Sequence, residues 1–317
     1  MDPMVAMSIT LSVVVCTHNR WKTLKTCLES LAAQQLDFSL WEVVVVDNAS
    51  TDETKDVVQG FSKGILPLQY IYEERLGLSR ARATGFRNSR GRYVAYLDDD
   101  AKAHPGWCAA ICQTFDQNAA TDPGRVAALG GPVELAFETE RPPWLTAELE
   151  LFYSRVDLGR AVRSFPPHSC PVGANMAFRR EILQRHPWDE NLIMCEDVEL
   201  FNRIAADGFT FLYAPAMRVT HFVPAARCTV EWLIRRYYAE GLDQKNLRHG
   251  FLPKARLLVR AVLELLRSGV LLLFGDKDRR LFHRCKITLQ IGSLEGFLNT
   301  RGRSTVFRER FNPTKSR

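Results

Sequence analysis

The sequence predicts an α/β fold: a mainly parallel central sheet flanked by helices, with a helical C-terminal extension. Three observations lead to this prediction. Apolar runs of strand length alternate with helical segments through the first hundred residues. The runs are continuous, without alternating polar positions, which is typical of strands covered on both faces. Their spacing implies right-handed crossover connections, which place successive strands parallel to one another.

Four buried strands are predicted in the first hundred residues, with a helix in each connection. The strands are the apolar runs Leu11–Cys16, Trp41–Val46, Leu68–Tyr72 and Tyr93–Leu97. The helices are expected from Arg20 to about residue 34, from Ser50 to about residue 61, and over Leu78–Ser89. Asn19 is the expected N-cap of the first helix. Ser50 and Glu53 fit a capping box at the start of the second.

The second hundred residues are less regular. A helix is expected from Pro105 to about residue 115, and Val126–Leu135 predicts a strand with a Gly-Gly bend. Residues 138–168 are rich in proline and aromatic residues, which is typical of a long loop that is functional or disordered. A helix is expected at Glu196, and one or two strands are expected over Phe209–Phe222.

The composition is that of a soluble globular protein, with 46% hydrophobic and 25% charged residues in a chain of 317. Arginine-rich segments at 75–92, 227–260 and 277–317 account for the net charge of +6. They suit anionic partners such as phosphates or acidic lipid surfaces. The sequence has no zinc-finger, basic-zipper or RNA-binding signature, so nucleic acid is not an expected partner.

The cysteines and the apolar segments predict the compartment. Eight cysteines are scattered without a C-x-x-C pair, as in a cytoplasmic protein with reduced thiols. No signal peptide is evident, and no uninterrupted apolar run reaches the roughly 18 residues of a membrane span. We therefore expect a cytoplasmic protein. Peripheral attachment to the inner face of the membrane stays open as an alternative.

Three adjacent acids, Asp98–Asp100, directly follow the predicted strand Tyr93–Leu97, at the end where parallel sheets bind their ligands. Side chains alternate along a strand, so Asp98 and Asp100 are expected to point one way and Asp99 the other. The first and third carboxylates would then serve one ion or ligand together. A solvated acidic turn is the alternative interpretation.

Polar residues end three of the predicted strands and are expected at one edge of the sheet: Thr17–Asn19, Asp47–Asn48 and Asp98–Asp100. No G-x-G-x-x-G follows the first strand and no phosphate-loop motif is present, which argues against the nucleotide-binding folds that use them. An acidic crevice binds a diphosphate best through a divalent cation with oxygen ligands, Mg²⁺ or Mn²⁺. Asp47 suits a hydrogen bond to a base or ribose.

Further candidates lie later in the chain. Glu196 and Asp197 are expected to begin a helix, where their charges either cap the helix or supply a catalytic base beside the acidic crevice. His221 ends a predicted strand and is either structural or a metal ligand. Trp144 and Asn175 are candidate acceptor contacts, and a buried core position is the alternative for the tryptophan.

Five segments together resemble the inverting glycosyltransferases of family 2, which have the GT-A nucleotide-sugar transferase fold, a Rossmann-like α/β arrangement. The segments are VVVCTHNR at 13–20, VVVDNASTDET at 44–54, GLSRARATGFRNSRGRYVAYLDDDA at 77–101, GANMAFRR at 173–180 and CEDVEL at 195–200. The resemblance covers residues 9–222, about two thirds of the chain. The sequence lacks the Q-x-x-R-W motif and the membrane spans of the family's processive synthases. A non-processive enzyme of the hexosyltransferase class is therefore expected.

The resemblance implies a role for each matching residue. The donor nucleotide sugar would be bound by Thr17, Asn19, Arg20, Asp47, Asn48, Arg82, Asp98 and Asp99. Asp100 and His221 would hold the metal, with Asp98 as the other outer acid of the D-x-D motif. Asp197 would be the catalytic base, with Glu196 beside it.

The predicted domain organisation has three parts. A catalytic domain is expected over residues 1–225, with a donor-binding half at about 9–101 and an acceptor half at about 102–225. A helical region follows at 226–300, and a basic tail follows at 301–317.

One helix in the C-terminal region, Ala255–Phe274, is expected to be amphipathic. Its polar face would carry Arg256, Arg260, Glu264 and Arg267. Its apolar face would carry Val259, Val262, Leu263, Leu266, Val270 and Leu273. Two interpretations stay open: the helix packs on the catalytic domain, or it lies on an anionic lipid surface, which would suit a lipid-linked acceptor.

The leading hypothesis is a metal-dependent inverting glycosyltransferase. It would move a sugar from a nucleotide-diphosphate donor, a UDP-sugar by preference, to a hydroxyl of a polysaccharide, glycolipid or other glycoconjugate. One alternative is a nucleotidyltransferase acting on sugar phosphates, but its lysine- and glycine-rich loop is missing. The other is a non-catalytic sugar-nucleotide-binding subunit of a glycan assembly complex. The presence of all the site acids, Asp98, Asp100, Glu196 and Asp197, argues against that alternative.

Overall fold

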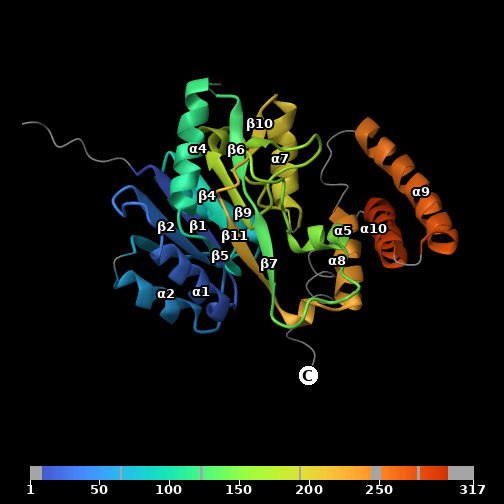
Figure 1. The fold of residues 1–317 in the computed structure, drawn as a ribbon, viewed down its shortest axis with the longest axis horizontal. Helices are drawn as coiled ribbons and strands as arrows, with labels where there is room; N and C mark the ends of the chain where they lie inside the picture. Colours follow the sequence, from blue (N-terminus) through green and yellow to red (C-terminus); the bar gives the residue numbers. More distant parts are fainter. Residues whose placement is uncertain are drawn as a thin grey trace, which may run out of the picture. The chain divides into compact units, whose positions relative to one another are not determined.

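The computed structural model describes residues 9–64, 66–121, 124–192, 194–243, 251–276 and 279–298. The chain divides into two compact units. The first unit contains the residues up to Leu192 and Glu196–Thr229, and the second contains 193–195 and the residues from Val230 onward. Both sheets belong to the first unit, and the described part of the second unit is helical (Figure 1).

The large sheet of the first unit has eight strands in the order β3-β2-β1-β4-β9-β6-β10-β8. They are β1 (Leu11–Thr17), β2 (Trp41–Asp47), β3 (Leu68–Tyr72), β4 (Tyr93–Leu97), β6 (Val126–Gly130), β8 (Arg163–Ser164), β9 (Asn175–Arg179) and β10 (Thr210–Tyr213). Only β8 and β9 run against the other six. The predicted α/β fold with a mainly parallel central sheet is confirmed.

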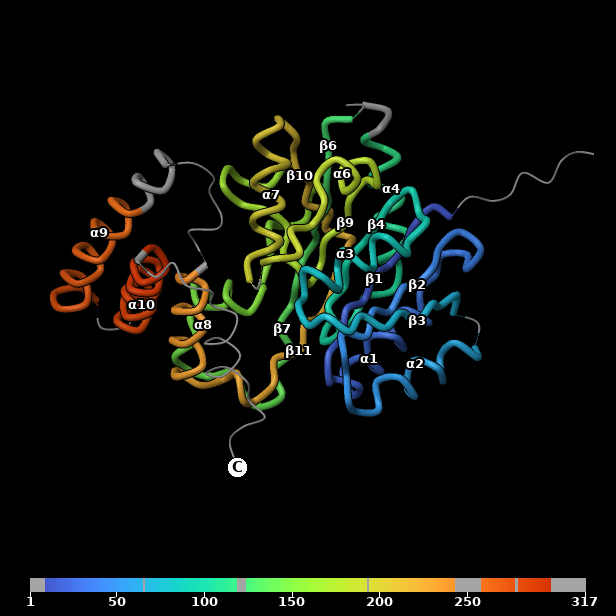
Figure 2. The backbone as a smooth tube through the Cα atoms, turned by 180° about the vertical axis from the view of Figure 1, so that it is seen from behind, coloured from blue at the N-terminus to red at the C-terminus, as the bar shows by residue number. Residues whose placement is uncertain are grey.

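Helices cover both faces of this sheet. They are α1 (Trp21–Ala32), α2 (Thr54–Ser62), α3 (Leu78–Asn88), α4 (Trp107–Thr121), α6 (Arg180–Arg185) and α7 (Glu196–Ala206). Figure 1 views the sheet from the side of α1 and α2, and Figure 2 views it from the side of α3.

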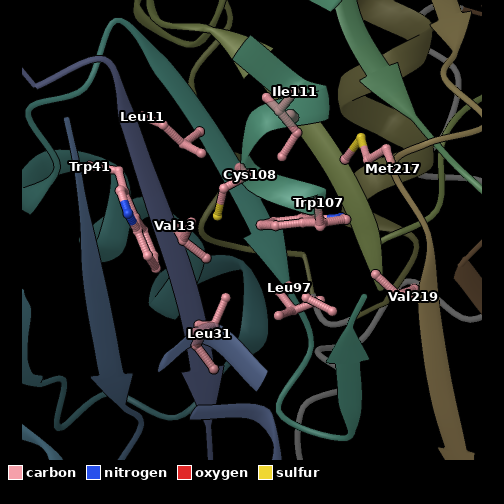
Figure 3. Close-up of a cluster of buried hydrophobic side chains, with 14 of the residues drawn as sticks. Leu11, Val13, Leu31, Trp41, Leu97, Trp107, Cys108, Ile111, Met217 and Val219 are labelled. Atoms are coloured by element: carbon pink, nitrogen blue, oxygen red, sulfur yellow. The ribbon is translucent and has the colours of Figure 1, made fainter. Parts of the chain in front are cut away.

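The continuous valine runs are explained by this two-sided cover. Val13 and Val15 pack into one core with residues of α1 and α4. Val14, between them, packs into a second core with residues of α3 and α7. Figure 3 shows part of the first core, where Val13 and Trp41 of the sheet lie near Trp107 and Ile111 of α4. A strand buried on both faces has no polar positions to alternate, which is why periodicity was absent from the sequence.

A second, three-stranded sheet was not predicted. It consists of β5 (Ala101–Ala103), β11 (Val219–Val223) and β7 (Val133–Phe137), in the order β5-β11-β7. The predicted strand Val126–Leu135 is in fact two strands, because the chain leaves the large sheet at Gly130 and enters the small one at Val133. A side chain at Gly131, in between, would collide with the backbone of Met217. The small sheet matters for function because β11 carries His221.

Three short helical segments complete the first unit: α5 (Ala147–Glu150) and the 3-10 turns Leu151–Tyr153 and Ala225–Arg227. The first two interrupt the predicted loop of 138–168.

The predicted helix caps were wrong. α1 begins after Arg20 and α2 after Glu53, and neither has a side-chain cap hydrogen bond. The Asn19 backbone N–H instead donates to the Ser50 hydroxyl over 2.9 Å, and the side-chain amide oxygen of Asn19 accepts from the Thr51 N–H over 2.7 Å. Asn19 and Ser50 therefore bond the loops after β1 and β2 to each other, and it is Asp52 that accepts from the Thr54 N–H at the start of α2.

The second unit contains α8 (Val230–Asp243), α9 (Phe251–Phe274) and α10 (Arg280–Leu298). Helix α10 packs against both α8 and α9. A side chain at Gly292 would collide with the backbone of Tyr238, so this glycine permits the close approach of α8 and α10. The predicted basic tail, 301–317, lies outside the described residues. Among the residues that are described, no helix combines the length and the apolar character that crossing a bilayer requires.

Candidate active site

The carboxyl ends of β1, β2 and β4 lie side by side, as the sequence predicted. β1 pairs in parallel with both β2 and β4, and Thr17 stands opposite Asp47 in the register. The Thr17 hydroxyl donates a 2.7 Å hydrogen bond to Asp99, just beyond the end of β4. Residues about 80 positions apart in the sequence are thus brought to one edge of the sheet.

The three consecutive acids lie in a turn rather than on a strand. β4 ends at Leu97, and the Ala101 N–H donates to the Asp98 carbonyl over 3.0 Å. The guanidinium of Arg20 lies 3.0 Å from a carboxylate oxygen of Asp99 and 3.0 Å from one of Asp100. These two neighbours therefore share one partner, because strand alternation stops where the strand stops.

Asp98 and Asp100 nevertheless converge on a common point together with His221. One ligand atom from each of the three residues lies within 4.8 Å of the other two. The pairing of β11 with β5 places His221 opposite Ala101, directly after the acid turn. The Nε2 of His221 lies 3.0 Å from the Asp100 carboxylate, and its Nδ1 lies 2.9 Å from the Tyr153 carbonyl oxygen. A histidine held through one nitrogen in this way presents the other nitrogen to a ligand.

The donor set fits a hard divalent cation. Two carboxylates and one imidazole suit Mg²⁺ or Mn²⁺. The electrostatics agree, because burial raises the pKa of Asp98 above its ordinary range and that of Asp99 to about 6. Burial also opposes ionisation of Asp100, but its hydrogen bond with His221 and the charge of Arg20 bring its pKa below the ordinary range. A bound cation would relieve the repulsion among the acids.

A buried arginine connects this acid turn to the start of α7. Arg82, on α3, forms an ion pair with Glu196 and lies 3.5 Å from Asp98. Its side chain is 3% exposed and also lies over the ring of Trp188. Burial disfavours the charge of Arg82, but the surrounding carboxylates, Glu196 first, raise its pKa. Burial raises the pKa of Glu196 to about 7, and Arg82 opposes that shift.

Asp197 is held differently from its neighbour Glu196. One of its carboxylate oxygens accepts the Gly173 N–H over 3.1 Å, and the other accepts the Val198 N–H over 2.8 Å. A side chain at Gly173 would displace the guanidinium of Arg82, so the glycine leaves room for Arg82 beside Asp197. Asp197 is half-buried, whereas Glu196 is buried and occupied by Arg82. Asp197 is therefore the acid of this pair that a substrate can reach.

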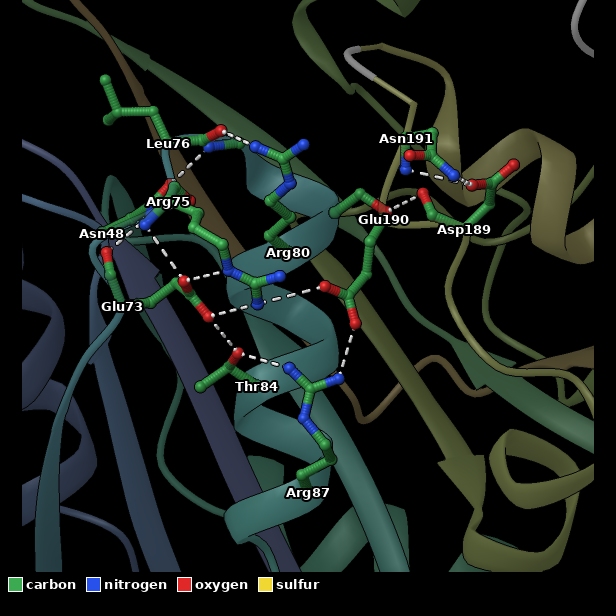
Figure 4. A network of polar contacts seen from close by, with 12 residues as sticks. Asn48, Glu73, Arg75, Leu76, Arg80, Thr84, Arg87, Asp189, Glu190 and Asn191 are labelled. Carbon is green, nitrogen blue, oxygen red and sulfur yellow. Dashed lines mark hydrogen bonds and ion pairs between the residues drawn. The ribbon is translucent and has the colours of Figure 1, made fainter.

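Two of the predicted donor-binding residues are tied into the protein. The Asp47 carboxylate accepts hydrogen bonds from the Tyr70 hydroxyl and the Ser50 N–H, at 2.7 and 2.9 Å. The Asn48 amide donates to the carbonyls of Glu73 and Arg75 and accepts from the Gly77 N–H. Figure 4 shows Asn48 beside the Glu73 carboxylate network that follows β3.

The two predicted acceptor contacts have different positions. Asn175 is fully buried, and its amide bonds to Trp107 and to the carbonyls of Pro132 and Met217. These bonds tie Asn175 to the two connections that lead from the large sheet to the small one, and its acceptor contact stays a prediction. Trp144 is half-buried in the turn before α5.

Sequence reasoning missed two contributors to the site. Arg227 lies 3.5 Å from the Asp100 carboxylate, and its only signal was its place in an arginine-rich segment. The backbone carbonyl oxygen of Tyr153 accepts a hydrogen bond from His221. A backbone contact does not depend on the side chain, so the sequence could not reveal it.

The eight-stranded sheet and its acid-lined edge agree with the predicted GT-A fold. The model of the family described as Glycosyl transferase family 2 matches residues 12–186, more than half of the chain. The chain therefore belongs to glycosyltransferase family 2, and the predicted family and enzyme class are confirmed.

Two relatives and one solved structure illustrate the similarity. The chain is 28% identical over 249 residues to a glucosyl-dolichyl phosphate glucuronosyltransferase of Haloferax volcanii, covering 74% of this chain and 76% of the relative. It is 24% identical over 299 residues to the succinoglycan biosynthesis protein ExoM of Rhizobium meliloti, covering 91% and 93%. A mannosyltransferase of Pyrobaculum calidifontis, solved with GDP-Man and Mn²⁺, superposes with a TM-score of 0.63 at 21% identity, covering 95% of this chain and 92% of that one. At that identity the superposition shows the fold alone.

Proposed function

We propose that this glycosyltransferase is metal-dependent, inverting and non-processive, and that it transfers one sugar from a UDP-sugar to a hydroxyl acceptor. The convergence of Asp98, Asp100 and His221 carries the proposal. These residues would hold Mn²⁺ or Mg²⁺. The cation, when bound, would neutralise the charge that develops on the departing nucleoside diphosphate.

Asp197 is the proposed catalytic base. An acceptor hydroxyl is too weak an acid to ionise near neutral pH, so its proton must be taken as it attacks. The acceptor oxygen forms a bond to the anomeric carbon while the bond from that carbon to the diphosphate oxygen breaks, and the proton passes to Asp197. One displacement inverts the anomeric centre. The two backbone N–H groups that hold Asp197 support this role because they orient its carboxylate.

Glu196 is proposed as a positioning residue rather than a second base. Its carboxylate is buried and paired with Arg82, so it is not available to an acceptor proton. Arg82 in turn lies near Asp98. The Glu196–Arg82 pair would therefore hold the metal-binding acids and the base at fixed positions relative to each other.

Exposure divides the proposed donor residues into two groups. Asn19 and Arg20 are exposed and Asp98 is 33% exposed, so these three are proposed to contact the donor directly. The other five are buried and bonded within the protein, and they are proposed to shape the site and fix its charge: Thr17, Asp47, Asn48, Arg82 and Asp99.

The acceptor is proposed to be a lipid-linked sugar or a growing polysaccharide. One relative is named for action on glucosyl-dolichyl phosphate and the other for succinoglycan biosynthesis, and these names support a glycan acceptor. The half-buried Trp144 remains the proposed acceptor-stacking residue.

Donor binding with and without metal tests the proposal. A thermal-shift screen of UDP-, GDP- and dTDP-sugars in Mn²⁺, Mg²⁺ or EDTA should give stabilisation only with a divalent cation, largest with a UDP-sugar. Stabilisation by a GDP-sugar instead would correct the nucleotide, and equal stabilisation in EDTA would contradict metal dependence. Release of nucleoside diphosphate on adding acceptor extracts marks sugar transfer, whereas release of pyrophosphate would mark a nucleotidyltransferase.

A further inference from the structure

Helix α9 presents a continuous apolar surface to solvent. More than half of the large hydrophobic side chains that are exposed among the described residues lie on this one helix. They are Leu258, Val259, Val262, Leu263, Leu266, Val270, Leu273 and Phe274, with exposures of 41% to 84%. We call these eight residues the α9 face. Contiguous apolar surface of this kind marks an interaction site in soluble proteins.

The opposite side of α9 carries small and polar residues together with the half-buried Leu265 and Leu272. Ala261 and Ser268 are buried, at 0% and 2% exposure. Glu264 lies on the same side, since its carboxylate reaches Lys286 of α10 at 4.0 Å. With about 3.6 residues per turn, these positions are opposite Val259, Leu266 and Val270. Leu265 and Leu272 therefore serve packing inside the unit, whereas the eight residues of the α9 face remain available for a further contact.

The charges beside the α9 face are positive. From Leu258 to Phe274, the part of α9 whose side chains are described, the exposed charged residues are Arg260 and Arg267. The single acid in this stretch, Glu264, lies 4.0 Å from Lys286 of α10 and 3.5 Å from Arg267. Between Phe251 and Leu298 the sequence has nine lysines and arginines against four acids. The partner that complements the surface is therefore both apolar and negatively charged.

We propose that the α9 face binds an anionic lipid surface, with α9 lying in the plane of the interface. The eight apolar side chains would enter the boundary between headgroups and acyl chains, and Arg260 and Arg267 would meet the headgroup phosphates. This orientation agrees with the finding that no described helix can cross a bilayer.

A second copy of the chain complements this surface less well. In a symmetric dimer through the α9 face, the same surface lies on both sides of the interface. The arginines flanking the stripe would meet arginines or apolar residues, with no exposed acid on the described part of the helix to pair with them. The proposal does not depend on the donor or on the chemistry of the active site.

Co-sedimentation of the full chain with vesicles tests the proposal. The protein should bind vesicles of equal parts phosphatidylglycerol and phosphatidylcholine, and bind pure phosphatidylcholine weakly. The double variant Leu263→Glu with Leu266→Glu should reduce the partition coefficient by about tenfold or more, because it inserts charge into the apolar contact. Arg260→Gln and Arg267→Gln should each reduce binding to the anionic vesicles by about fivefold and leave binding to phosphatidylcholine unchanged.

The matched control is Val162→Glu, which introduces the same charge at a position that is 55% exposed in the first unit. It should bind vesicles like the wild type. All variants should keep the wild-type circular dichroism spectrum, because every substituted side chain is exposed. Wild-type failure to bind anionic vesicles would overturn the proposal. Sedimentation-velocity dimers that the double variant abolishes would assign the α9 face to a second copy and would overturn it as well.

Discussion

Two groups of carboxylates, one around Glu73 after β3 and one around Asp98–Asp100 after β4, differ in how far arginines compensate their negative charge. Glu73, after β3, accepts hydrogen bonds from the Arg75 guanidinium and N–H and from the Thr84 hydroxyl. Glu190 pairs with Arg87 at 2.6 Å and with Arg75 at 3.2 Å (Figure 4). In this network the two acids, Glu73 and Glu190, are balanced by two arginines, Arg75 and Arg87. The hydrogen bonds from Arg75 lower the pKa of Glu73 to about 2 against the effect of burial.

The active-site group has more acids than counter-charges. Asp98, Asp99, Asp100, Glu196 and Asp197 share Arg20, Arg82, Arg227 and His221. Burial raises the pKa of several of these acids instead of lowering it. The comparison teaches that an acid cluster with its charge fully paired stabilises the fold, whereas one with excess charge is suited to a cation and to proton transfer.

The largest effect is expected from Asp197→Asn, which removes the proposed base. Transfer should fall by about a hundredfold to ten-thousandfold, because the amide cannot accept the acceptor proton. The donor dissociation constant measured by calorimetry should stay within about twofold of the wild type, since binding does not use the base. Asp207→Asn, just beyond the other end of α7, is the matched control and should leave transfer unchanged. Full activity of Asp197→Asn would assign the base elsewhere.

Asp100→Asn tests whether the acid turn is a cation site. The variant should bind Mn²⁺ at least about tenfold more weakly and lose the effect of Mn²⁺ on donor binding. Calorimetric titration of Mn²⁺ in the absence of donor measures this directly. Asp116→Asn changes an acid that is 52% exposed and paired with Arg92, and it should titrate like the wild type. An unchanged Mn²⁺ affinity in Asp100→Asn would place the cation outside this turn.

Glu196→Gln separates positioning from proton transfer. It keeps the shape of the Arg82 contact but removes the charge, so the free energy of unfolding should fall by about 1–2 kcal/mol. Transfer should fall by less than about tenfold, far less than in Asp197→Asn. Glu199→Gln on the same helix, where Glu199 pairs with Arg203, should cost similar stability without any loss of transfer. If Glu196→Gln is as inactive as Asp197→Asn, the two acids act together in catalysis.

The smallest effect on activity is expected from Glu73→Gln, which changes stability alone. The pKa of Glu73 in the folded protein, about 2, is below its ordinary value of 4.5, so its stabilisation is complete above about pH 4.5 and is lost as the pH falls toward 2. The variant should lower the free energy of unfolding by about 2 kcal/mol at pH 6. Urea titrations should find that this difference shrinks by more than half at pH 3. Glu134→Gln changes an exposed acid paired with Arg218 and should lower the free energy of unfolding at pH 6 by less than Glu73→Gln does.

The sequence predicted most of the fold because its strongest signals are local. Uninterrupted apolar runs located β1 to β4 within one residue at each end. The acids after β4 were identified as a candidate pair, Asp98 and Asp100, and these two converge with His221. Strand alternation, from which the pairing of Asp98 with Asp100 was predicted, does not cause it. The strand ends at Leu97, and the acids lie in a turn.

Predictions failed where a side chain bonds to a segment distant in sequence. Asn19 and Ser50 fit helix caps by local rules, yet each bonds across to the other loop. Asn175 lies in a family segment, and it is fully buried with its amide bonded to the carbonyls of Pro132 and Met217, far away in the sequence. In each case the polar group had several satisfactory partners, and only the fold determined which one it met.

The sequence by itself determined the order of the elements and the residue types of the chemistry, because uninterrupted apolar runs and acidic strand ends are properties of short segments. Tertiary structure decided three further features. It paired β11 with β5 and so brought His221 to Asp100. It buried Arg82 between Asp98 and Glu196, which left Asp197 as the accessible acid. It also left eight large apolar residues of α9 exposed, while Ala261 and Ser268 of the same helix are buried. These features depend on which surfaces meet, and the pattern of a single segment does not contain that information.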